Sequence, residues 1–586
     1  MSYESAFETR DDLNQYGSNA FLLFALELRF EIEDIHTVAA DSLTDGRDDK
    51  KCDLVYIDID EGLAVISQSY FTNDSLKTEA PANKASDLNT AASWLLCRDT
   101  SDLPELLRPS AIQLRAAIKE GKINTIQLWY VHNCPGSKNV LNELKTVQMT
   151  AFNSLKYLLQ SEEKTPNVVV LEVGREQIKS WYESLTTPIL VSDEFRVSVP
   201  GGFSLQGTDW EAFVTAIPAS WLHGIYNQYR TNSNEIDLFS ANIRGYLGSR
   251  QSDKNINNGI KSTASKDPEH FWTFNNGLTI LTHKWNHDEE SGFLTVTGIS
   301  IVNGAQTTGS IGSLEETPDS EAMVPARFIR CNNEAIIKQI IRYNNSQNKI
   351  EAPDFRSGDD IQKRLRDEFS KFSSVTYTGG RRGGYEDKIK RPSNLLPSDT
   401  AGQAIAAFHQ DPLTAYNEKS KIWISDTLYS KYFSEQTTAQ HIVFCYSLLR
   451  AVEEKKRELL SASSKSELTQ KQKQTLSFFR NRGATFLLVS AISASLESIL
   501  GMPIPNRFSL RFHGFISPQD AIQNWKPIVE ASSPFVDKLI PAVERGLNNA
   551  GRVKNVVSDF TSFIDATKDF NESKYLTFSN QVNLQI

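Results

Sequence analysis

The sequence predicts a multidomain α/β protein, and three observations lead to this fold class. The chain has 586 residues, which at roughly 100–200 residues per domain suggests about three domains. Strand-like and helical segments alternate as far as residue 195, turn-rich strands dominate residues 196–400, and apolar helical patterns dominate residues 401–586. We therefore expect an α/β domain, a mixed α/β domain and a mostly helical domain within these boundaries.

The expected elements of the first domain follow from periodicity. Apolar residues recur at helical spacing in residues 19–35, and a charged, turn-rich segment occupies residues 42–52. Helices are expected at 86–120 and near 141–159. The expected strands are residues 53–60, 63–71, 125–133 and 167–174.

The other two domains are predicted in the same way. In the middle domain we expect helices at 333–345 and 358–371, and strands at 277–282, 293–302 and 325–330. We also expect Trp221, Trp272 and Phe274 to lie in its core rather than to stack on bases. In the last domain, apolar faces predict helices at 401–410, 439–460 and 484–500.

Composition favours a cytoplasmic protein. No apolar run approaches the ~18 residues that span a membrane, and the N-terminus lacks the basic and apolar regions of a signal peptide. The five cysteines are scattered, as expected for reduced thiols. The net charge of −10 means that any nucleic-acid contact must come from a local basic patch, although the charge is also explained by solubility alone.

A possible metal site lies on two adjacent strands of the first domain. Asp53 opens one strand, Gln68-Ser69-Tyr70 lies on the next, and the upstream helix offers Glu27 or Glu31. Carboxylates are needed to hold Mg²⁺, which prefers oxygen ligands and activates water for phosphodiester hydrolysis. The arrangement resembles the PD-(D/E)xK nucleases, whose pattern is an Asp at the start of one strand and Glu/Gln-x-Lys on the next.

That resemblance implies a restriction-endonuclease-like α/β fold for residues 1–195 and a metal-dependent endonuclease. The implied catalytic positions are Glu27, Asp53, Gln68 and Tyr70, with Asp53 and Gln68 as ligands of Mg²⁺ or Mn²⁺. Tyr70 departs from the pattern because it stands where the nucleases have a lysine. The alternatives are a degenerate nuclease fold used for binding or assembly, and a simple hairpin with a solvated acidic face.

Four stretches between residues 238 and 355 carry a more specific resemblance. They are LFSANIRGYLG (238–248), HFWTFNNGLTIL (270–281), ISIVNGAQTTGSI (299–311) and RYNNSQNKIEAPDF (342–355). Together with residues 377–386 and 404–423, they resemble the abortive-infection phage-resistance (AIPR) family over about a third of the chain. The resemblance implies an anti-phage defence protein that responds to a phage-derived trigger.

The segment Asn303–Thr307 predicts a ligand site. Gly304 lets the backbone approach a ligand closely, and the helix expected to follow offers free amides to a phosphate. The turn resembles that of the ParB-like nucleotide-binding fold, with Asn303 in place of an aspartate and Thr307 in place of an arginine. The resemblance implies a nucleotide such as ATP, GTP or CTP. The expected binding residues are Arg244, Asn275, Asn276, Asn303, Gly304, Gln306, Thr307 and Asn344.

Two alternatives remain for these residues and their surroundings. The amides can instead be structural clips, because Asn and Gly are common in turns for conformational reasons. A basic segment downstream suits contact with a nucleic-acid backbone, although it also fits an ordinary charged loop. Its cations are Arg381, Arg382, Lys388, Lys390 and Arg391.

The sequence thus leaves three hypotheses about function. The first is a defence effector that acts on DNA or RNA under control of a nucleotide or phage signal. The second is a catalytically inactive sensor or adaptor that binds a phage or host protein. The third is a regulator that uses the ParB-like core as a DNA clamp. A homo-oligomer or an operon-encoded partner protein fits each of them, and no membrane partner is expected.

Overall fold

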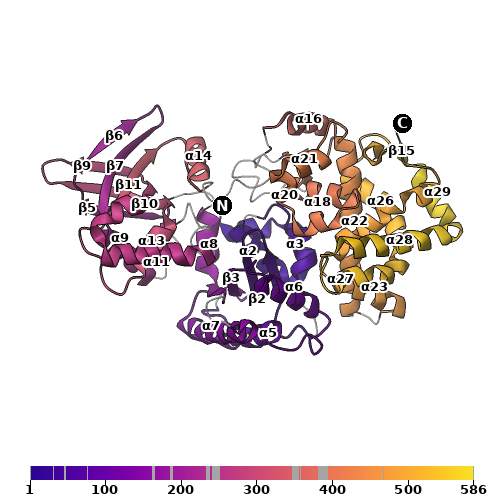
Figure 1. Cartoon of the computed structure of the whole chain (residues 1–586), viewed down its shortest axis with the longest axis horizontal. Helices are drawn as coiled ribbons and strands as arrows, with labels where there is room; N and C mark the ends of the chain where they lie inside the picture. Colours follow the sequence, from indigo (N-terminus) through magenta and orange to yellow (C-terminus); the bar gives the residue numbers. More distant parts are fainter. Residues whose placement is uncertain are drawn as a thin grey trace.

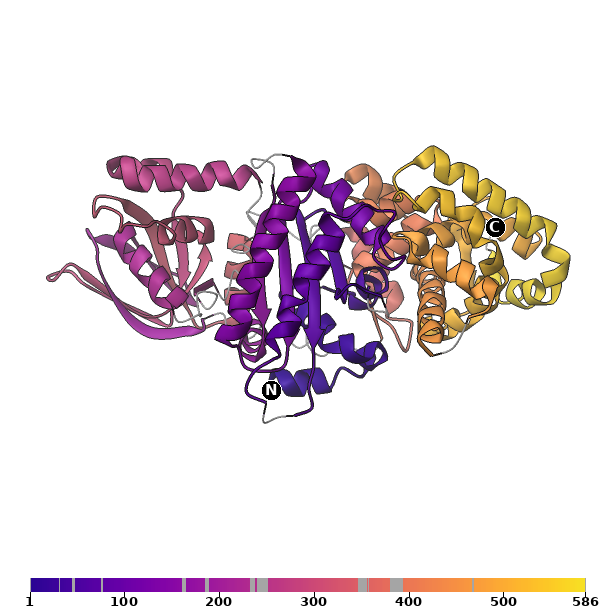
Figure 2. The same cartoon turned by 90° about the horizontal axis from the view of Figure 1, so that it is seen from below.

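The N-terminal domain lies between the other two bodies of the molecule (Figure 1). A strand-rich body, the sheet domain, lies on one side of it and a helical domain on the other, an order that the second view repeats (Figure 2). This computed structural model describes residues 2–30, 32–44, 48–74, 77–160, 165–184, 189–231, 238–239, 251–345, 356, 358–379, 394–465 and 468–584. The predicted fold class, a multidomain α/β protein with helices at its C-terminal end, is confirmed.

The N-terminal domain is built on a four-stranded sheet in the order β1-β2-β3-β4. The β1–β2 pair is antiparallel, and β2–β3 and β3–β4 are parallel. All four expected strands are confirmed, as β1 (Leu54–Asp58), β2 (Leu63–Tyr70), β3 (Thr125–His132) and β4 (Asn167–Val173). Its helices are α1 (Tyr3–Glu8), η1 (Asp11–Asn19), α2 (Ala20–Phe30), α3 (Ile35–Ser42), α4 (Ala82–Ser86), α5 (Leu88–Leu96), α6 (Arg108–Lys119), α7 (Lys138–Leu159) and α8 (Arg175–Ser184).

Helices cover both faces of this sheet, because side chains alternate between the faces along each strand. Leu63 and Val65 of β2 pack with α2 and α8, whereas Ala64 and Ile66 pack with α4 to α7. Every residue of β3 is buried as a result. The face covered by α4 to α7 also carries Gln68, two residues beyond Ile66.

The sheet domain holds a second, mixed sheet of seven strands in the described residues, in the order β5-β10-β8-β11-β7-β6 with β9 beside β10. The strands are β5 (Val191–Ser198), β6 (Gly202–Gln206), β7 (Trp210–Pro218), β8 (Leu278–Leu281), β9 (Lys284–Asp288), β10 (Phe293–Asn303) and β11 (Met323–Cys331). The helices are α9 (Ala219–Thr231), α11 (Gln251–Lys266), η3 (Pro268–His270), α12 (Phe271–Phe274), α13 (Ala305–Gly312) and α14 (Glu334–Asn345).

The expected core position of two aromatic residues is wrong. Trp272 and Phe274 are 46% and 65% exposed, because α12 is a four-residue helix that buries only Phe271. Trp221 packs against the core as expected.

The helical domain has one large core, in which α22 packs along α26 and beside α18 and α24. Helix α24 is buried at every position from Ala484 to Ser493, because its sequence is apolar or small on all sides. The longer helices are α16 (Asp360–Phe369), α18 (Ser398–Phe408), α22 (Ala439–Lys465), α23 (Gln470–Arg480), α24 (Ala484–Ala494), α26 (Pro518–Ser532) and α28 (Ala550–Ala566).

The shorter elements of the helical domain complete its surface. They are α19 (Pro412–Asn417), α20 (Lys421–Ile424), α21 (Asp426–Tyr432), α25 (Leu496–Leu500), η4 (Arg507–Ser509), η5 (Ser533–Leu539), α27 (Ile540–Val543), η6 (Lys568–Asn571), α29 (Glu572–Ser579), and the strands β12 (Thr376–Tyr377), β13 (Leu395–Leu396), β14 (Leu510–Phe512) and β15 (Val582–Leu584). Over the described part of the chain, no helix combines the length and apolarity needed to cross a membrane.

Buried polar contacts join the helical domain to the N-terminal domain. Arg450 on α22 donates to Asp34, the residue that caps α3, and its Nη1 donates to Glu453 Oε2 at 2.6 Å. Arg482, which lies between α23 and α24, contacts the N-terminal sheet itself: its Nη1 donates to the backbone carbonyl of Val55 on β1 at 3.0 Å. The two domains are therefore held together by charged groups away from solvent.

Candidate functional site

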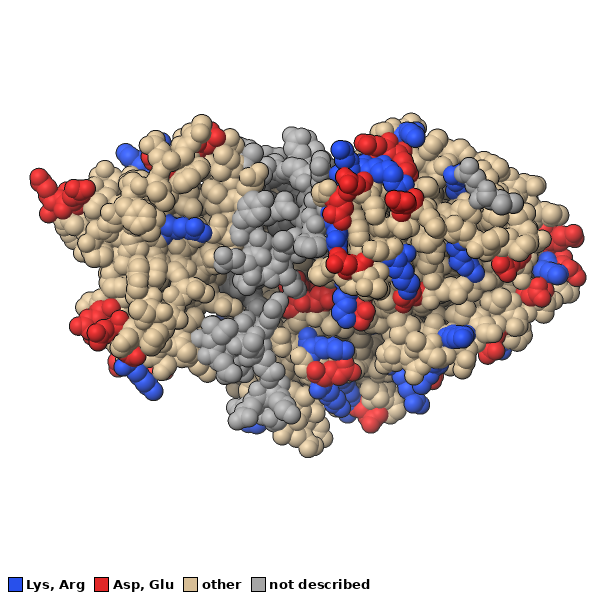
Figure 3. Space-filling model, turned by 45° about the horizontal axis from the view of Figure 1, so that its top comes forward, with Lys and Arg blue, Asp and Glu red and all other residues tan. Residues whose placement is uncertain are grey.

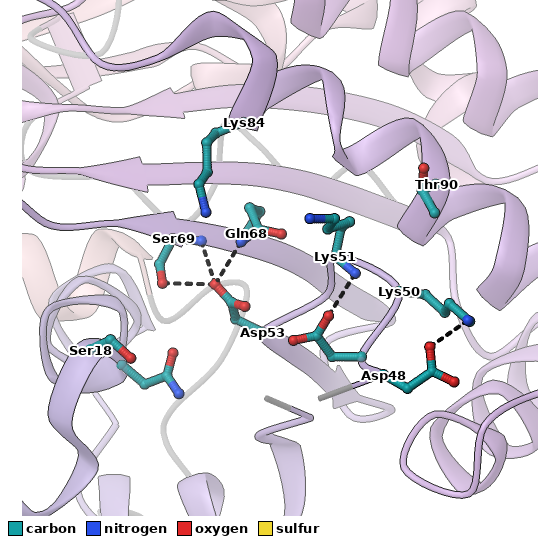
Figure 4. Close-up of a pocket in the computed structure, with 11 residues that line it drawn as sticks. Ser18, Asp48, Lys50, Lys51, Asp53, Gln68, Ser69, Lys84 and Thr90 are labelled. Atoms are coloured by element: carbon teal, nitrogen blue, oxygen red, sulfur yellow. Dashed lines mark hydrogen bonds and ion pairs between the residues drawn. The ribbon is translucent and has the colours of Figure 1, made fainter. Parts of the chain in front are cut away.

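A cavity of about 570 Å³ opens at one edge of the N-terminal sheet, beside the start of β1 and the last residues of β2 (Figure 4). The charged segment Asp48–Lys51, which leads into β1, forms part of its wall. Asp53, Gln68, Ser69 and Lys84 form another part. The cavity thus collects two of the sequence-predicted catalytic residues and a lysine that the sequence analysis did not single out.

Asp53 is held in place by three hydrogen bonds to a single carboxylate oxygen. Its Oδ2 accepts from Ser69 N at 2.6 Å, from Ser69 Oγ at 2.8 Å and from Gln68 Nε2 at 3.2 Å. The hairpin register causes this arrangement. Leu54, the first residue of β1, pairs with Ser67 on β2, so Asp53 just before β1 lies beside Gln68 and Ser69. Asp53 is only 7% exposed.

Gln68 presents an oxygen that lacks a partner. Its side chain is 5% exposed, its amide nitrogen is used by Asp53, and its Oε1 accepts no hydrogen bond from the part of the chain that the structure describes. Leaving a buried acceptor unsatisfied costs about 1–3 kcal/mol. A hard cation that prefers oxygen ligands would satisfy it, and Mg²⁺ commonly uses only one or two protein ligands and keeps several waters.

The donor set therefore fits such a cation, with Asp53 and Gln68 as its protein ligands. Within the described residues, no group of three or more His, Cys, Asp or Glu side chains is placed to hold a metal ion. A site here would depend on the carboxylate, the amide oxygen and water.

The other two predicted catalytic residues do not line this cavity. Tyr70 packs against the core on the α4–α7 side, and its hydroxyl accepts a hydrogen bond from Lys77, whose amine also lies 4.7 Å from the ring centre. Glu27 lies on α2, at the opposite face of the sheet, and accepts from Arg10 Nη1 at 2.7 Å. Glu31 is outside the described residues.

Three lysines face the cavity, and two of them are already engaged. Lys50 pairs with Asp48 and lies 4.6 Å from the ring centre of Trp94, and Lys51 is 3.8 Å from Asp87. Lys84 comes from α4, and its amine points toward Asp53, Gln68 and Ser69 (Figure 4). No spacing in the sequence distinguishes Lys84 from a surface lysine, which explains why it was missed.

The expected strand–turn–helix at Asn303–Thr307 is present in the sheet domain. β10 ends at Asn303, Gly304 has a φ of +99°, and α13 begins at Ala305. A Cβ atom at Gly304 would lie 2.1 Å from Leu278 Cδ2, so the turn is pressed against β8 and needs glycine. Gln306 is half-buried and Thr307 is buried.

The predicted amide residues of this region lie around the start of β8, where Asn303 pairs with Thr279 and Thr279 donates to Asn344. Asn275 donates to the backbone carbonyl of Phe271 at 3.2 Å, which is a structural clip, and Asn276 is exposed. Asn344 accepts from Arg327 and from Thr279 Oγ1, so Arg327 is a neighbour that the sequence analysis missed. The predicted cations at 244, 381, 382, 388, 390 and 391 lie outside the described residues.

Charges on the visible surface are mixed. On the face drawn in Figure 3, lysines and arginines alternate with acidic residues over the helical domain instead of forming one basic patch. A nucleic-acid contact on this face would therefore depend on local groups rather than on a broad electrostatic field.

Comparison with known proteins identifies one segment. Residues 239–513 match a family model described as AIPR protein. The match supports the AIPR identification over the sheet domain from α11 onward and over much of the helical domain, and it does not extend to the cavity in the N-terminal domain. No curated protein and no solved structure matches the chain.

Proposed function

We propose that the protein is an anti-phage defence effector of the abortive-infection type whose N-terminal domain is a metal-dependent nuclease. The AIPR match supports the defence role. The nuclease activity is supported by one observation, the buried Asp53–Gln68 pair that opens into a cavity also faced by Lys84. The two strands that carry the proposed PD-(D/E)xK residues form an antiparallel hairpin, which supports the proposal by bringing Asp53 and Gln68 together.

Asp53 and Gln68 would hold the Mg²⁺ or Mn²⁺, and Ser69 keeps the Asp53 carboxylate oriented through two hydrogen bonds. A bound divalent cation supplies a more acidic water and neutralises charge on a phosphate. The reaction is hydrolysis: a water oxygen bonds to phosphorus, one phosphorus–oxygen ester bond breaks, and the departing oxygen takes a proton. The buried position of the pair keeps it ordered before substrate binds.

The sheet domain is proposed to sense a nucleotide or a phage-derived signal. The positive φ of Gly304 and the start of α13 place backbone amides at the end of β10, a shape that suits a phosphate. Because Asn275 and Asn344 are committed to structural hydrogen bonds, the proposed contacts are centred on residues 303–307.

The test is a cleavage assay with plasmid, phage DNA and RNA in Mg²⁺ or Mn²⁺, with and without ATP, GTP and CTP. Asp53→Ala is expected to abolish metal-dependent cleavage, whereas Asp102→Ala, at an exposed position of the same domain, should retain it. Dependence on a nucleotide would assign a switch role to the sheet domain. Absence of cleavage by the unmodified protein in every condition would contradict the nuclease proposal and favour the binding adaptor.

A further inference from the structure

We propose that Lys84 is the cation that binds the phosphodiester in the Asp53–Gln68 cavity, in place of the lysine that Tyr70 replaces. The inference rests on the proposed nuclease function and adds to it the group that contacts the substrate phosphate. It is carried by the position of Lys84, by the absence of an ion-pair partner for it among the described residues, and by the place that Tyr70 occupies.

The backbone around Lys84 is fixed. Ala80 and Ala85, on either side of it in sequence, are buried in the core beneath α4. Tyr130 on β3 donates its hydroxyl to the carbonyl of Pro81 at 3.1 Å, which anchors the start of α4. The half-buried Lys84 side chain therefore leaves a rigid support and extends over the cavity (Figure 4).

The charge of Lys84 is available for a ligand. Lys50 and Lys51 are paired with Asp48 and Asp87, but Lys84 makes no ion pair with any residue that the structure describes. Lys84 and Asp53 line the same cavity of about 570 Å³ without forming an ion pair, so the cavity can take up an anion and a metal ion between the groups that line it. A phosphate fits this space because its oxygens can contact the ammonium and the metal together.

Tyr70 occupies the position on β2 where the nuclease pattern has its lysine, so the proposed cation, Lys84, comes from helix α4 instead. Its ring fills the end of the core on the α4–α7 side, and its hydroxyl is used by Lys77. That contact holds Lys77 outside the cavity. Lys77 is therefore the less favourable of the two candidates for the cation that binds the phosphate. The cavity volume of about 570 Å³ is within the usual range for small-ligand sites and can admit a nucleotide unit of a longer strand.

The experiment compares Lys84→Met, Lys84→Arg, Lys77→Met and Lys119→Met in the full-length protein. Lys119, at the end of α6, is exposed and lies in the same domain, so it controls for loss of one positive charge. Binding of a fluorescein-labelled DNA strand is measured by anisotropy in Ca²⁺ over a series of salt concentrations. Cleavage of the same strand is measured in Mg²⁺, and melting temperatures check that each variant is folded.

Lys84→Met should weaken binding at every DNA sequence tested and lower the slope of log affinity against log salt by about one. Lys84→Arg should restore the slope, and the changes at Lys77 and Lys119 should leave binding and cleavage as in the unmodified protein. A Lys84→Met protein that binds and cleaves normally, or a loss that follows Lys77 instead, would overturn the inference while leaving the nuclease in place.

The nuclease proposal and the Lys84 proposal can be tested separately, because one is measured by cleavage and the other by binding. DNA binding that depends on Lys84 without any cleavage would support the phosphate contact and reject the nuclease. If the unmodified protein neither binds nor cleaves DNA or RNA, both proposals fail.

Discussion

Replacing Arg450 by methionine removes a positive charge from the contact between the helical domain and the N-terminal domain. Arg450 is the shared partner of Asp34 on the N-terminal side and Glu453 on α22, and all three side chains are largely buried. Methionine retains the unbranched stem but no donor. The substitution therefore leaves two carboxylates buried near each other without the charge that compensates them.

The expected cost follows from that change. Removing one partner of a buried ion pair destabilises a protein by about 3–5 kcal/mol, because the remaining charge is left without compensation. Here two carboxylates lose the same partner, which places the effect at the upper end of that range. Thr37 also loses the hydrogen bond that its hydroxyl accepts from Arg450 Nη1 at 3.0 Å.

The lowered pKa of Asp34 also predicts how the stability contributed by this contact depends on pH. Burial alone would raise the pKa of Asp34, but the charge of Arg450 and hydrogen bonds from Thr400 and Thr37 hold it well below its usual range. A carboxyl group with a lowered pKa stabilises the folded state above its unfolded pKa of about 3.9, and this contribution is lost as the pH falls further. Arg450→Met should remove that part of the acid sensitivity.

The assay is urea unfolding at pH 7, followed both by circular dichroism and by proteolysis at the contact between the domains. Lys455→Met, on the same helix, is the matched control, because Lys455 is paired only loosely with Glu458 at 3.8 Å. The reasoning is refuted if Arg450→Met costs less than about 1 kcal/mol, the usual range of an exposed ion pair. The triple variant with Asp34→Asn and Glu453→Gln should recover much of the loss.

Two further outcomes are expected. Gly304→Ala should destabilise the sheet domain by about 1–3 kcal/mol, because the turn needs a positive φ and the new Cβ would lie 2.1 Å from Leu278 Cδ2. The control is Gly259→Ala, which has open space around it and should not lower the melting temperature. Equal effects of the two substitutions would contradict the role of the turn. Burial and the neighbouring His441 lower the pKa of His409 to about 2, and burial lowers that of His441 to about 4. Since the unfolded chain takes up these protons below about pH 6.5 and the folded chain does not, the free energy of unfolding should fall by up to about 1.4 kcal/mol per pH unit for each histidine between pH 6.5 and 4. Melting curves at pH 7 and 5 measure this, and a His409→Asn/His441→Asn protein with the same pH dependence would contradict it.

The part of the site that follows from local pairing could be predicted from the sequence. Two consecutive strands were predicted at 53–60 and 63–71, and when such strands pair in an antiparallel hairpin the first residues of one lie close to the last residues of the other. Asp53 and Gln68 were expected together because of the PD-(D/E)xK resemblance, and Gln68 does donate a hydrogen bond to Asp53. The turn at Gly304 was predictable in the same way, because a strand, a glycine and a helix follow one another directly in the chain.

Other contacts depend on packing that no local pattern encodes. Glu27 lies on the expected helix, but Arg10 pairs with it at the face of the sheet opposite to the cavity. Lys84 is brought to the site by the route of the chain between β2 and α4. Asp34 and Arg450 are separated by 416 positions, so only the folded structure places them together.

The contact between Arg482 and Val55 has a consequence for the end of the first sheet. β1 is one of its two outer strands, and an outer strand carries backbone groups that can pair with another chain. Arg482 occupies the Val55 carbonyl, Leu43 forms a bridge to Leu54, and Ser420 donates to Asp60 just beyond the strand. Arg482 and Ser420 of the helical domain, together with Leu43 of the N-terminal domain itself, thus cover the outer side of β1 much as an additional strand would, and they support the strand that follows Asp53.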